Sequence, residues 1–245
     1  SNPQGNTFFD ITITVQTATF YSTATGNWND NNTWSYTLAG PAVGAGIYPL
    51  AGDIVNIAGG FNVTATANAA CASVTFTTTT ATSLTISPGI TLDVSGAITI
   101  PRSGAGFNQI IVGSGILNAG TIAFTNGGTP SRHQITISTG TVNVAGDITT
   151  NSTTNGAAII FTGAGRLTAG GQLMSSGTVG GTLTTVAGST VEYNGTGDQT
   201  VKAVAYAGNL TLSGSGIKTL AGVTVNGILS MEGTATTTGT VATYG

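Results

Sequence analysis

Hydrophobic and polar residues alternate through most of this chain, in short runs that are separated by glycine. A motif of two apolar-x-apolar triplets, each followed by glycine, recurs along the chain. Its copies begin at Leu84, Ile110, Ile135, Ile159, Leu183 and Leu210. The successive copies are spaced by 26, 25, 24, 24 and 27 residues. Strict alternation is typical of β-strands, and a fixed period of this length is typical of a solenoid. The pattern therefore predicts an all-β chain folded as a parallel β-helix, or β-solenoid.

Inward-facing residues of one coil are expected to stack on the equivalent residues of the neighbouring coils. Three aliphatic ladders are predicted: Leu84, Ile110, Ile135, Ile159, Leu183 and Leu210; Leu92, Leu117, Val142 and Leu167; and Ile98, Ile122, Ile148 and Leu173. Three ladders imply about three short strands per coil, with coils stacked about 4.8 Å apart. The usual crossover between parallel strands predicts a right-handed helix.

The chain divides into three zones, and the solenoid is predicted to fill residues 51–245. Residues 1–21 hold a long alternating strand, and we expect it to be exchanged with a neighbouring subunit through the apolar residues Phe9, Ile11, Ile13 and Val15. Residues 22–50 are rich in turns, and their aromatic group is predicted to cap the core rather than to stack on sugars: Trp28, Trp34 and Tyr36.

The segment from Met231 to Gly245 carries almost no charge and no amphipathic helix, so we expect the last coil to be uncapped. A bare terminal coil presents unpaired backbone N–H and C=O groups to another chain. The chain starts at Ser1 without methionine, which we interpret as a processed or excised chain.

The amino-acid composition limits the classes of partner that we expect the protein to bind. Only 5 % of the residues are charged, the net charge is −3, and there are five Lys and Arg in total. No basic stripe exists for a phosphate backbone, so we expect no nucleic-acid partner. No apolar run approaches the roughly 20 residues of a membrane-spanning helix, so no membrane span is expected. Threonine, asparagine and glycine replace Lys and Glu, which favours an extracellular or cell-surface location.

Candidate catalytic and metal-binding residues are sparse. Glu192 and Asp198 are the closest acids in sequence, and no catalytic acid pair is predicted. Asp30 and Asp53 lie in turns, where carboxylates commonly bind local backbone. Cys71 is the only cysteine, which excludes an intrachain disulfide and a cysteine metal cluster. The sequence therefore predicts neither an enzyme, nor a metal site, nor a cofactor.

A candidate ligand edge consists of Arg102, Arg132 and His133, which fall in equivalent long turns of consecutive predicted coils. These side chains could hold a glycan or a carboxylate, or could simply keep a sparsely charged surface solvated. Ice binding is a third alternative, because the outward residues of the first ladder are mostly threonine. Two isoleucines interrupt that row: Thr85, Ile111, Thr136, Ile160, Thr184 and Thr211.

Three groups of segments resemble a known family. They are residues 23–35, residues 51–57 with 69–74, and residues 189–201 with 209–222. Together they resemble the β-helical repeat region of large secreted, adhesin-like surface proteins of Bacteroidota and related bacteria, many of which leave the cell by type IX secretion. Such proteins normally end in a sorting domain that we do not recognise in this sequence, so the resemblance leaves the export route open.

The leading hypothesis is a non-enzymatic extracellular structural protein, which self-assembles into a surface filament or forms an adhesive stalk. Its partner would be another copy, joined head to tail by β-edge association, or other parts of a larger surface protein. The alternative is a glycan-binding or polysaccharide-active β-helix module, and ice binding is the third.

Overall fold

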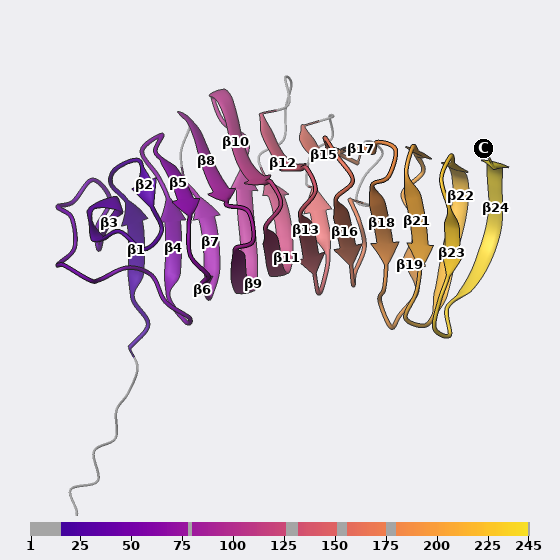
Figure 1. Cartoon of the computed structure of the whole chain (residues 1–245), viewed down its shortest axis with the longest axis horizontal. Coiled ribbons are helices and arrows are strands. Elements are labelled where there is room, and N and C mark those ends of the chain that lie inside the picture. Colours follow the sequence, from indigo (N-terminus) through magenta and orange to yellow (C-terminus); the bar gives the residue numbers. More distant parts are fainter. Residues whose placement is uncertain (1–15, 78–79, 126–131, 151–155, 175–179, 245) are drawn as a thin grey trace, which may run out of the picture.

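The structure is a computed structural model of the chain and describes residues 16–77, 80–125, 132–150, 156–174 and 180–244. The four predicted strand-exchange residues, Phe9, Ile11, Ile13 and Val15, lie outside these ranges. Strands dominate, and helix among the described residues is limited to the 3-10 turn η1 (Asn31–Thr33). The strands lie side by side along the long axis, from β1 (Thr19–Ser22) and β3 (Trp34–Ser35) at one end to β24 (Thr236–Tyr244) at the other (Figure 1).

The described residues form three main sheets. Over these residues, the largest sheet contains 13 strands: β1, β3 (Trp34–Ser35), β4 (Ile54–Ile57), β6 (Ala69–Cys71), β7 (Ser73–Phe76), β9 (Thr91–Pro101), β11 (Ile116–Thr125), β13 (Thr141–Val144), β14 (Ile148–Thr150), β16 (Arg166–Ala169), β18 (Thr190–Tyr193), β21 (Asn209–Leu212) and β23 (Leu229–Met231). In the same described ranges, the second sheet contains seven strands: β2 (Gly26–Asn27), β5 (Asn62–Ala65), β8 (Thr80–Ile86), β10 (Ala105–Val112), β12 (His133–Ile137), β15 (Ala157–Phe161) and β17 (Thr182–Thr184). The third, again counted over described residues, contains four: β19 (Gln199–Thr200), β20 (Ala205–Tyr206), β22 (Ile217–Val225) and β24.

Strand pairing among the described residues is parallel, with one antiparallel exception between β1 and β3. Neighbouring strands in a sheet are therefore separated in sequence by other strands, as a solenoid requires. The predicted all-β class and the parallel sheets are confirmed.

The predicted ladders can be followed through the strand register. Leu92, Leu117, Val142 and Leu167 pair in that order along the largest sheet. The third predicted ladder is also in register, from Ile98 through Ile122 and Ile148 to Leu173. In the seven-stranded sheet the first ladder runs from Leu84 to Leu183 as predicted.

The prediction that Leu210 belongs to the first ladder is wrong. Leu210 pairs with Val191 and Leu229, so it continues the second ladder in the largest sheet. The physical reason is a change of period. Stacked side chains are 25 residues apart at Asn118 and Asp93, but 19 residues apart at Lys218 and Gln199. The shorter coils begin after β18.

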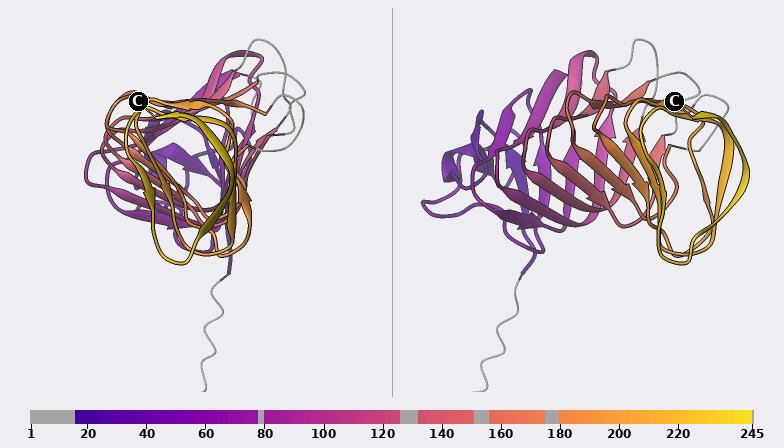
Figure 2. Two further views of the ribbon diagram at one scale, coloured as in Figure 1. Left: turned by 90° about the vertical axis from the view of Figure 1, so that its right-hand side faces the viewer. Right: turned by 45° about the vertical axis from the view of Figure 1, so that its right-hand side comes forward.

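The core lies between the sheets, which surround it when the molecule is viewed along its long axis (Figure 2). Inward positions of the central strands are filled by fully buried aliphatic residues such as Leu117, Ile122 and Val142. β-branched and aliphatic side chains suit a pleated surface that is buried on one face. Successive turns stack closely on one another. A Cβ added at Gly140, for example, would lie 2.5 Å from the carbonyl oxygen of Gly115 in the neighbouring turn.

Candidate functional site

The N-terminal end of the stack is closed by an aromatic cluster. Trp28 and Trp34 are buried, with ring centroids 5.3 Å apart in an edge-to-face arrangement. The indole nitrogen of Trp28 donates to the Pro49 carbonyl at 3.1 Å, and that of Trp34 donates to the Trp28 carbonyl at 2.6 Å. Tyr36 is 51 % exposed and covers the Phe20 ring at 5.2 Å. The two indoles are therefore not available to stack on a sugar.

Local hydrogen bonds set the position of this aromatic cluster. Asp30 caps η1 by accepting from the Asn32 N–H at 2.9 Å, which turns the chain into β3. The Asp53 carboxylate accepts from the N–H groups of Ala18 and Leu50, both at 2.8 Å. Both carboxylates accept hydrogen bonds from backbone N–H groups. β3 then pairs antiparallel with β1 and ends the largest sheet.

The opposite end is built differently. β23 is the outermost strand of the largest sheet, and β24 pairs with β22 alone in the described chain. Ile228 is 68 % exposed and Met231 is 51 % exposed at this end. The Thr236 N–H donates to the Gly216 carbonyl at 3.0 Å. Since alternate residues of a strand point to opposite neighbours, the Thr237 N–H is directed away from β22, toward the open edge.

The candidate ligand edge of Arg102, Arg132 and His133 is only partly assembled. His133 is fully buried, because β12 places it inward between Asn108 and Ala157 of the adjacent strands. Its ring lies 5.3 Å from the Phe124 ring, and its Nδ1 is 3.0 Å from the Ile100 carbonyl. The imidazole therefore cannot contact a ligand on the edge, which leaves the two half-buried arginines.

The environment of His133 favours the neutral ring. Burial lowers the pKa of His133, and the nearby charge of Arg102 lowers it further, against the opposing effect of the Ile100 carbonyl. If Nδ1 donates to Ile100, Nε2 must be an acceptor, and no hydrogen-bond partner is described for it.

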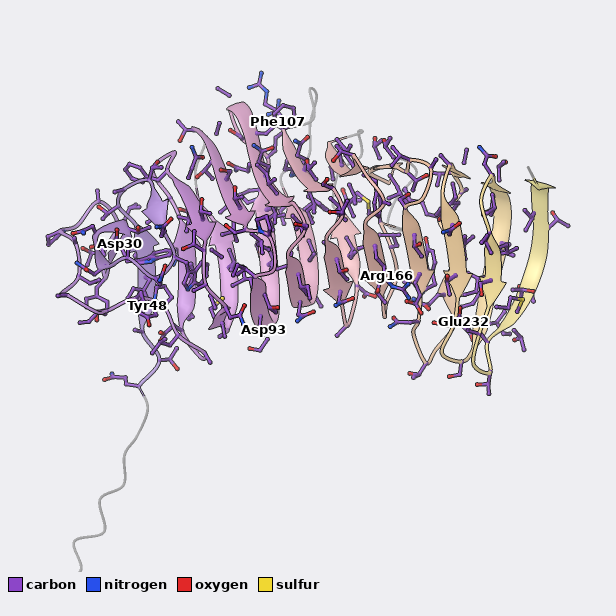
Figure 3. The ribbon with its side chains drawn as sticks, viewed as in Figure 1. Asp30, Tyr48, Asp93, Phe107, Arg166 and Glu232 are labelled. Carbon is purple, nitrogen blue, oxygen red and sulfur yellow. The ribbon has the colours of Figure 1, made fainter. Side chains whose placement is uncertain are left out.

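Charged side chains are spread along the molecule, as the positions of Asp93, Arg166 and Glu232 show (Figure 3). Arg166 forms an ion pair with Glu192, whose other oxygen accepts from the Ser213 hydroxyl at 2.6 Å. The ion pair joins the neighbouring strands β16 and β18, and Ser213 directly follows β21. The described residues contain no group of three or more His, Cys, Asp or Glu side chains placed to hold a metal ion.

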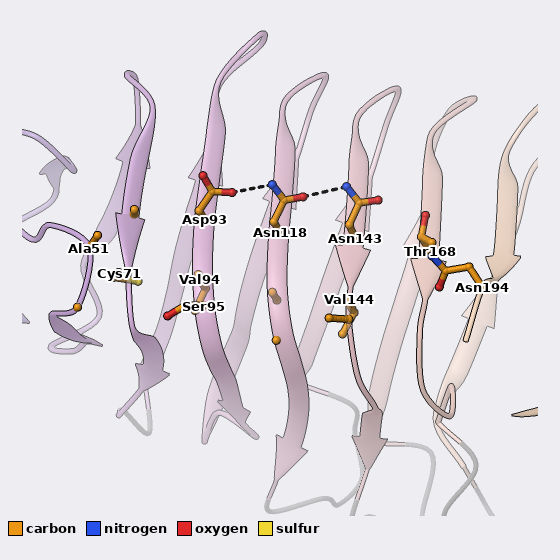
Figure 4. Close-up of a pocket in the computed structure, with 15 residues that line it drawn as sticks. Ala51, Cys71, Asp93, Val94, Ser95, Asn118, Asn143, Val144, Thr168 and Asn194 are labelled. Carbon is orange, nitrogen blue, oxygen red and sulfur yellow. Dashed lines mark hydrogen bonds between the residues drawn. The ribbon is translucent and has the colours of Figure 1, made fainter. Parts of the chain in front are cut away.

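An open groove of about 530 Å³ crosses the largest sheet along the stacking direction. Its polar residues come from successive strands, and its floor is made of small residues such as Ala119, Gly120 and Ala145. Asn118 donates to the Asp93 carboxylate at 2.6 Å, and Asn143 donates to the Asn118 carbonyl oxygen at 2.8 Å (Figure 4). Cys71 also lines the groove, but its thiol is buried, and burial raises its pKa to about 12.

The groove residues are not predicted as a site from the sequence, although a signal for them is present. Asp93, Asn118 and Asn143 occupy the middle position of the repeated triplets Leu-Asp-Val, Leu-Asn-Ala and Val-Asn-Val. Three polar residues with amide or carboxylate groups at one register position predict a hydrogen-bonded column, once the ladders on either side are assigned.

Two buried polar clusters lie in the shorter coils. Lys218 is fully buried, and its ammonium donates to the carbonyls of Gly195 (2.9 Å), Gly197 (3.2 Å) and Ser215 (2.8 Å) and to Gln199 Oε1 (2.7 Å). Burial lowers the pKa of Lys218, and the Asp198 charge partly restores it.

Tyr193 and Tyr206 form the second cluster, with their hydroxyls 3.1 Å apart. The Tyr206 hydroxyl donates to the Lys202 carbonyl at 3.0 Å, and the Lys202 N–H donates to the Tyr193 hydroxyl at 2.9 Å. This closed ring of hydrogen bonds satisfies both buried phenols.

Comparison with known proteins adds no relative. No family model, curated protein or solved structure matches the chain. Helices of the described residues include none long and apolar enough to span a membrane.

Proposed function

We propose that this protein is a non-enzymatic extracellular structural protein, which builds a surface filament or adhesive stalk by head-to-tail β-edge association. The observation that carries the proposal is the difference between the two ends of the described stack. One end is closed by buried indoles and an antiparallel strand, and the other leaves β23 and β24 with one unpaired side each.

The proposed architecture is a right-handed β-solenoid with about three short strands per coil. Parallel pairs such as Ile110 with Ile135 support it, because each brings together residues one repeat apart. Within one such repeat, the chain contributes β10 to the seven-stranded sheet and two paired segments of β11 to the largest sheet. Right-handedness follows from the preferred crossover between parallel strands.

The proposed occupant of the open edge is a second copy of this chain. The described chain begins at residue 16, beside β1, at the end opposite to β24. The preceding alternating segment, with Phe9, Ile11, Ile13 and Val15, would be donated across the joint as an added strand. A head-to-tail contact of this kind does not close, so it propagates into a filament.

The two alternatives have weaker support. A glycan-binding or polysaccharide-active site at the candidate ligand edge would lack His133, which is buried, and would have to rely on Arg102 and Arg132. An ice-binding face would need a regular row of threonines. The outward row of the seven-stranded sheet instead alternates between threonine and isoleucine from Thr85 to Thr184, and Thr211 pairs with Glu192 in the other sheet.

Negative-stain electron microscopy of the full chain at physiological salt tests the proposal. The unmodified protein is expected to form fibres whose axial repeat is close to the length of one molecule. Thr237→Pro removes the N–H that faces the open edge while leaving the contacts of β24 with β22, so it should abolish the fibres. Thr237→Ala is the matched control and should assemble normally.

Deletion of residues 1–15 separates the two parts of the proposal. Loss of fibres supports strand donation, whereas fibres that persist contradict it and leave direct edge pairing. Monodisperse short rods from the unmodified chain would refute self-assembly altogether.

A further inference from the structure

The groove across the largest sheet has the composition of a ligand-binding surface. Asp93, Asn118, Asn143 and Thr168 lie in one register column on β9, β11, β13 and β16. Three strand spacings separate the first from the last, so the row is about 14 Å long. The row runs across the strands, and therefore along the axis of the stack (Figure 4).

The amide groups of this row retain hydrogen-bonding capacity. A carboxamide has two N–H donors and an oxygen with two lone pairs. Asn118 uses one N–H toward Asp93 and one lone pair toward Asn143. The remaining donor and acceptor of each amide are not used by other side chains within the described residues. The two strands that carry Asn118 and Asn143 thus each offer a free N–H donor and an oxygen with a free lone pair, one strand spacing apart.

Thr168 extends the row by one strand. It lines the groove, and its side chain is 7 % exposed. A hydroxyl both donates and accepts, so Thr168 adds one more group that a sugar hydroxyl can complement.

A second hollow of about 360 Å³ continues the groove toward the N-terminal end, and the two share Ala51, Ala70 and Asp93 as lining residues. Tyr48 lines this hollow and is half-buried. A partly exposed aromatic ring provides an apolar surface beside polar groups. The small residues of the groove floor leave room for a flat ring to approach the sheet.

We infer that this groove binds a neutral polysaccharide, which lies along the axis of the stack. Sugar hydroxyls both donate and accept, which matches the free N–H and lone pair of each amide, and the apolar ring faces match Tyr48 and the alanine floor. Among the residues lining the groove there is one carboxylate and no lysine or arginine, so an anionic glycan would be disfavoured. An added peptide strand is also disfavoured, because the backbone groups of β9, β11 and β13 already pair with one another.

Isothermal titration of the full chain with neutral and anionic hexasaccharides tests the inference. The neutral probes are cellohexaose, xylohexaose and mannohexaose, and the anionic probe is a hexamer of galacturonic acid. At least one neutral probe should bind, with an affinity that does not change as salt is raised. The double variant Asn118→Ala/Asn143→Ala should weaken binding about tenfold, the loss expected for two hydrogen bonds.

A matched control exists on the other sheet. Gln134 donates to Gln109 at 2.9 Å across the same 25-residue spacing, and neither residue lines the groove. Gln109→Ala/Gln134→Ala should therefore leave the affinity unchanged. Ala145→Phe adds a ring at an exposed lining position and should block binding without removing a polar group.

Circular dichroism of each variant confirms that it is folded before titration. Failure of every neutral probe to bind, preference for the galacturonate hexamer, or equal losses in the asparagine and glutamine variants would each overturn the inference.

Discussion

The central coils and the C-terminal coils of this protein fill their interiors in different ways. Where the period is 25 residues, the column from Leu92 to Leu167 is aliphatic throughout. Where the period falls to 19 residues, the interior also holds the ammonium of Lys218 and two tyrosine hydroxyls. In both regions the buried polar groups are largely hydrogen-bonded, but in the shorter coils they bind the carbonyls of the turns.

This difference shows how a stack of parallel strands can shorten its repeat without losing register. A shorter coil brings its turns closer to the core, so turn carbonyls that would otherwise face solvent become buried. An unpaired buried carbonyl costs free energy, and a long side chain that ends in several donors can satisfy a group of them. Lys218 distributes its three protons among four oxygens of two successive coils.

The largest expected effect is on the aliphatic column. Leu117→Ala leaves a cavity between Leu92 and Val142, and we expect it to lower the free energy of unfolding by about 3–4 kcal/mol. Leu210→Ala, in the same column within the shorter coils, is the comparison. Hydrogen exchange followed by mass spectrometry should place each loss in its own coils, because repeats contact mainly their neighbours. Uniform loss of protection over the whole chain would contradict this separation.

Lys218→Met tests the polar interior of the shorter coils. The substitution keeps the aliphatic stem but removes every N–H donor of the ammonium, so the Gly197 and Ser215 carbonyls lose this partner. We expect a loss of about 2–3 kcal/mol, measured by urea unfolding. Lys202→Met is the control, because the Lys202 ammonium makes one long contact of 3.4 Å to the Met174 carbonyl. Similar losses of stability in both variants would mean that the hydrogen bonds of the Lys218 ammonium stabilise the protein no more than the single contact of Lys202.

The pH dependence of stability probes His133, one of the buried polar residues of the central coils. Because burial lowers the pKa of His133 below its ordinary value of 6.5, the unfolded chain takes up a proton at a pH where the folded chain does not. Stability should therefore be complete above pH 6.5 and fall on acidification, by at most about 1.4 kcal/mol per pH unit. His133 is the only histidine, so His133→Gln should flatten urea-unfolding profiles between neutral pH and the carboxylate range. If the unfolding free energy of His133→Gln changed with pH as steeply as that of the unmodified protein, the lowered pKa of His133 would be contradicted.

Tyr206→Phe gives the smallest effect. It removes one hydroxyl from the closed ring with Tyr193 and Lys202, and we expect a loss of about 1 kcal/mol in thermal unfolding. Tyr21→Phe, in the N-terminal strand β1, is a control of the same chemistry and should change stability less. Equal losses of stability in the two variants would indicate that the ring of hydrogen bonds between Tyr193, Tyr206 and Lys202 adds no stability to the shorter coils.

Much of the fold could be predicted from the pattern alone, because stacked coils repeat the same inward positions. Leu117, Ile122 and Ile135 each lie in their predicted ladder. Leu210 does not, because the apolar phrase looks the same in both sheets and only pairing reveals the shorter period. His133 was placed on the edge from its neighbours in sequence, whereas the alternation of β12 directs it inward.

The candidate sites were harder to predict for a related reason. Asn118 and Asn143 form a groove only because separate coils place them one above the other, and Lys218 is buried only because the coil around it is short. Composition favours a solvated position for lysine, so a buried one is not expected without the three-dimensional context.

The two repeat lengths also have a mechanical consequence. If the rod is pulled from its ends and coils detach one at a time, a central coil of 25 residues releases about 85 Å of chain, and a coil of 19 residues about 65 Å. Each detachment replaces about 4.8 Å of folded length. A fibre made of such rods would lengthen under load in two sizes of step, and would absorb work at each one before any joint between subunits had to break.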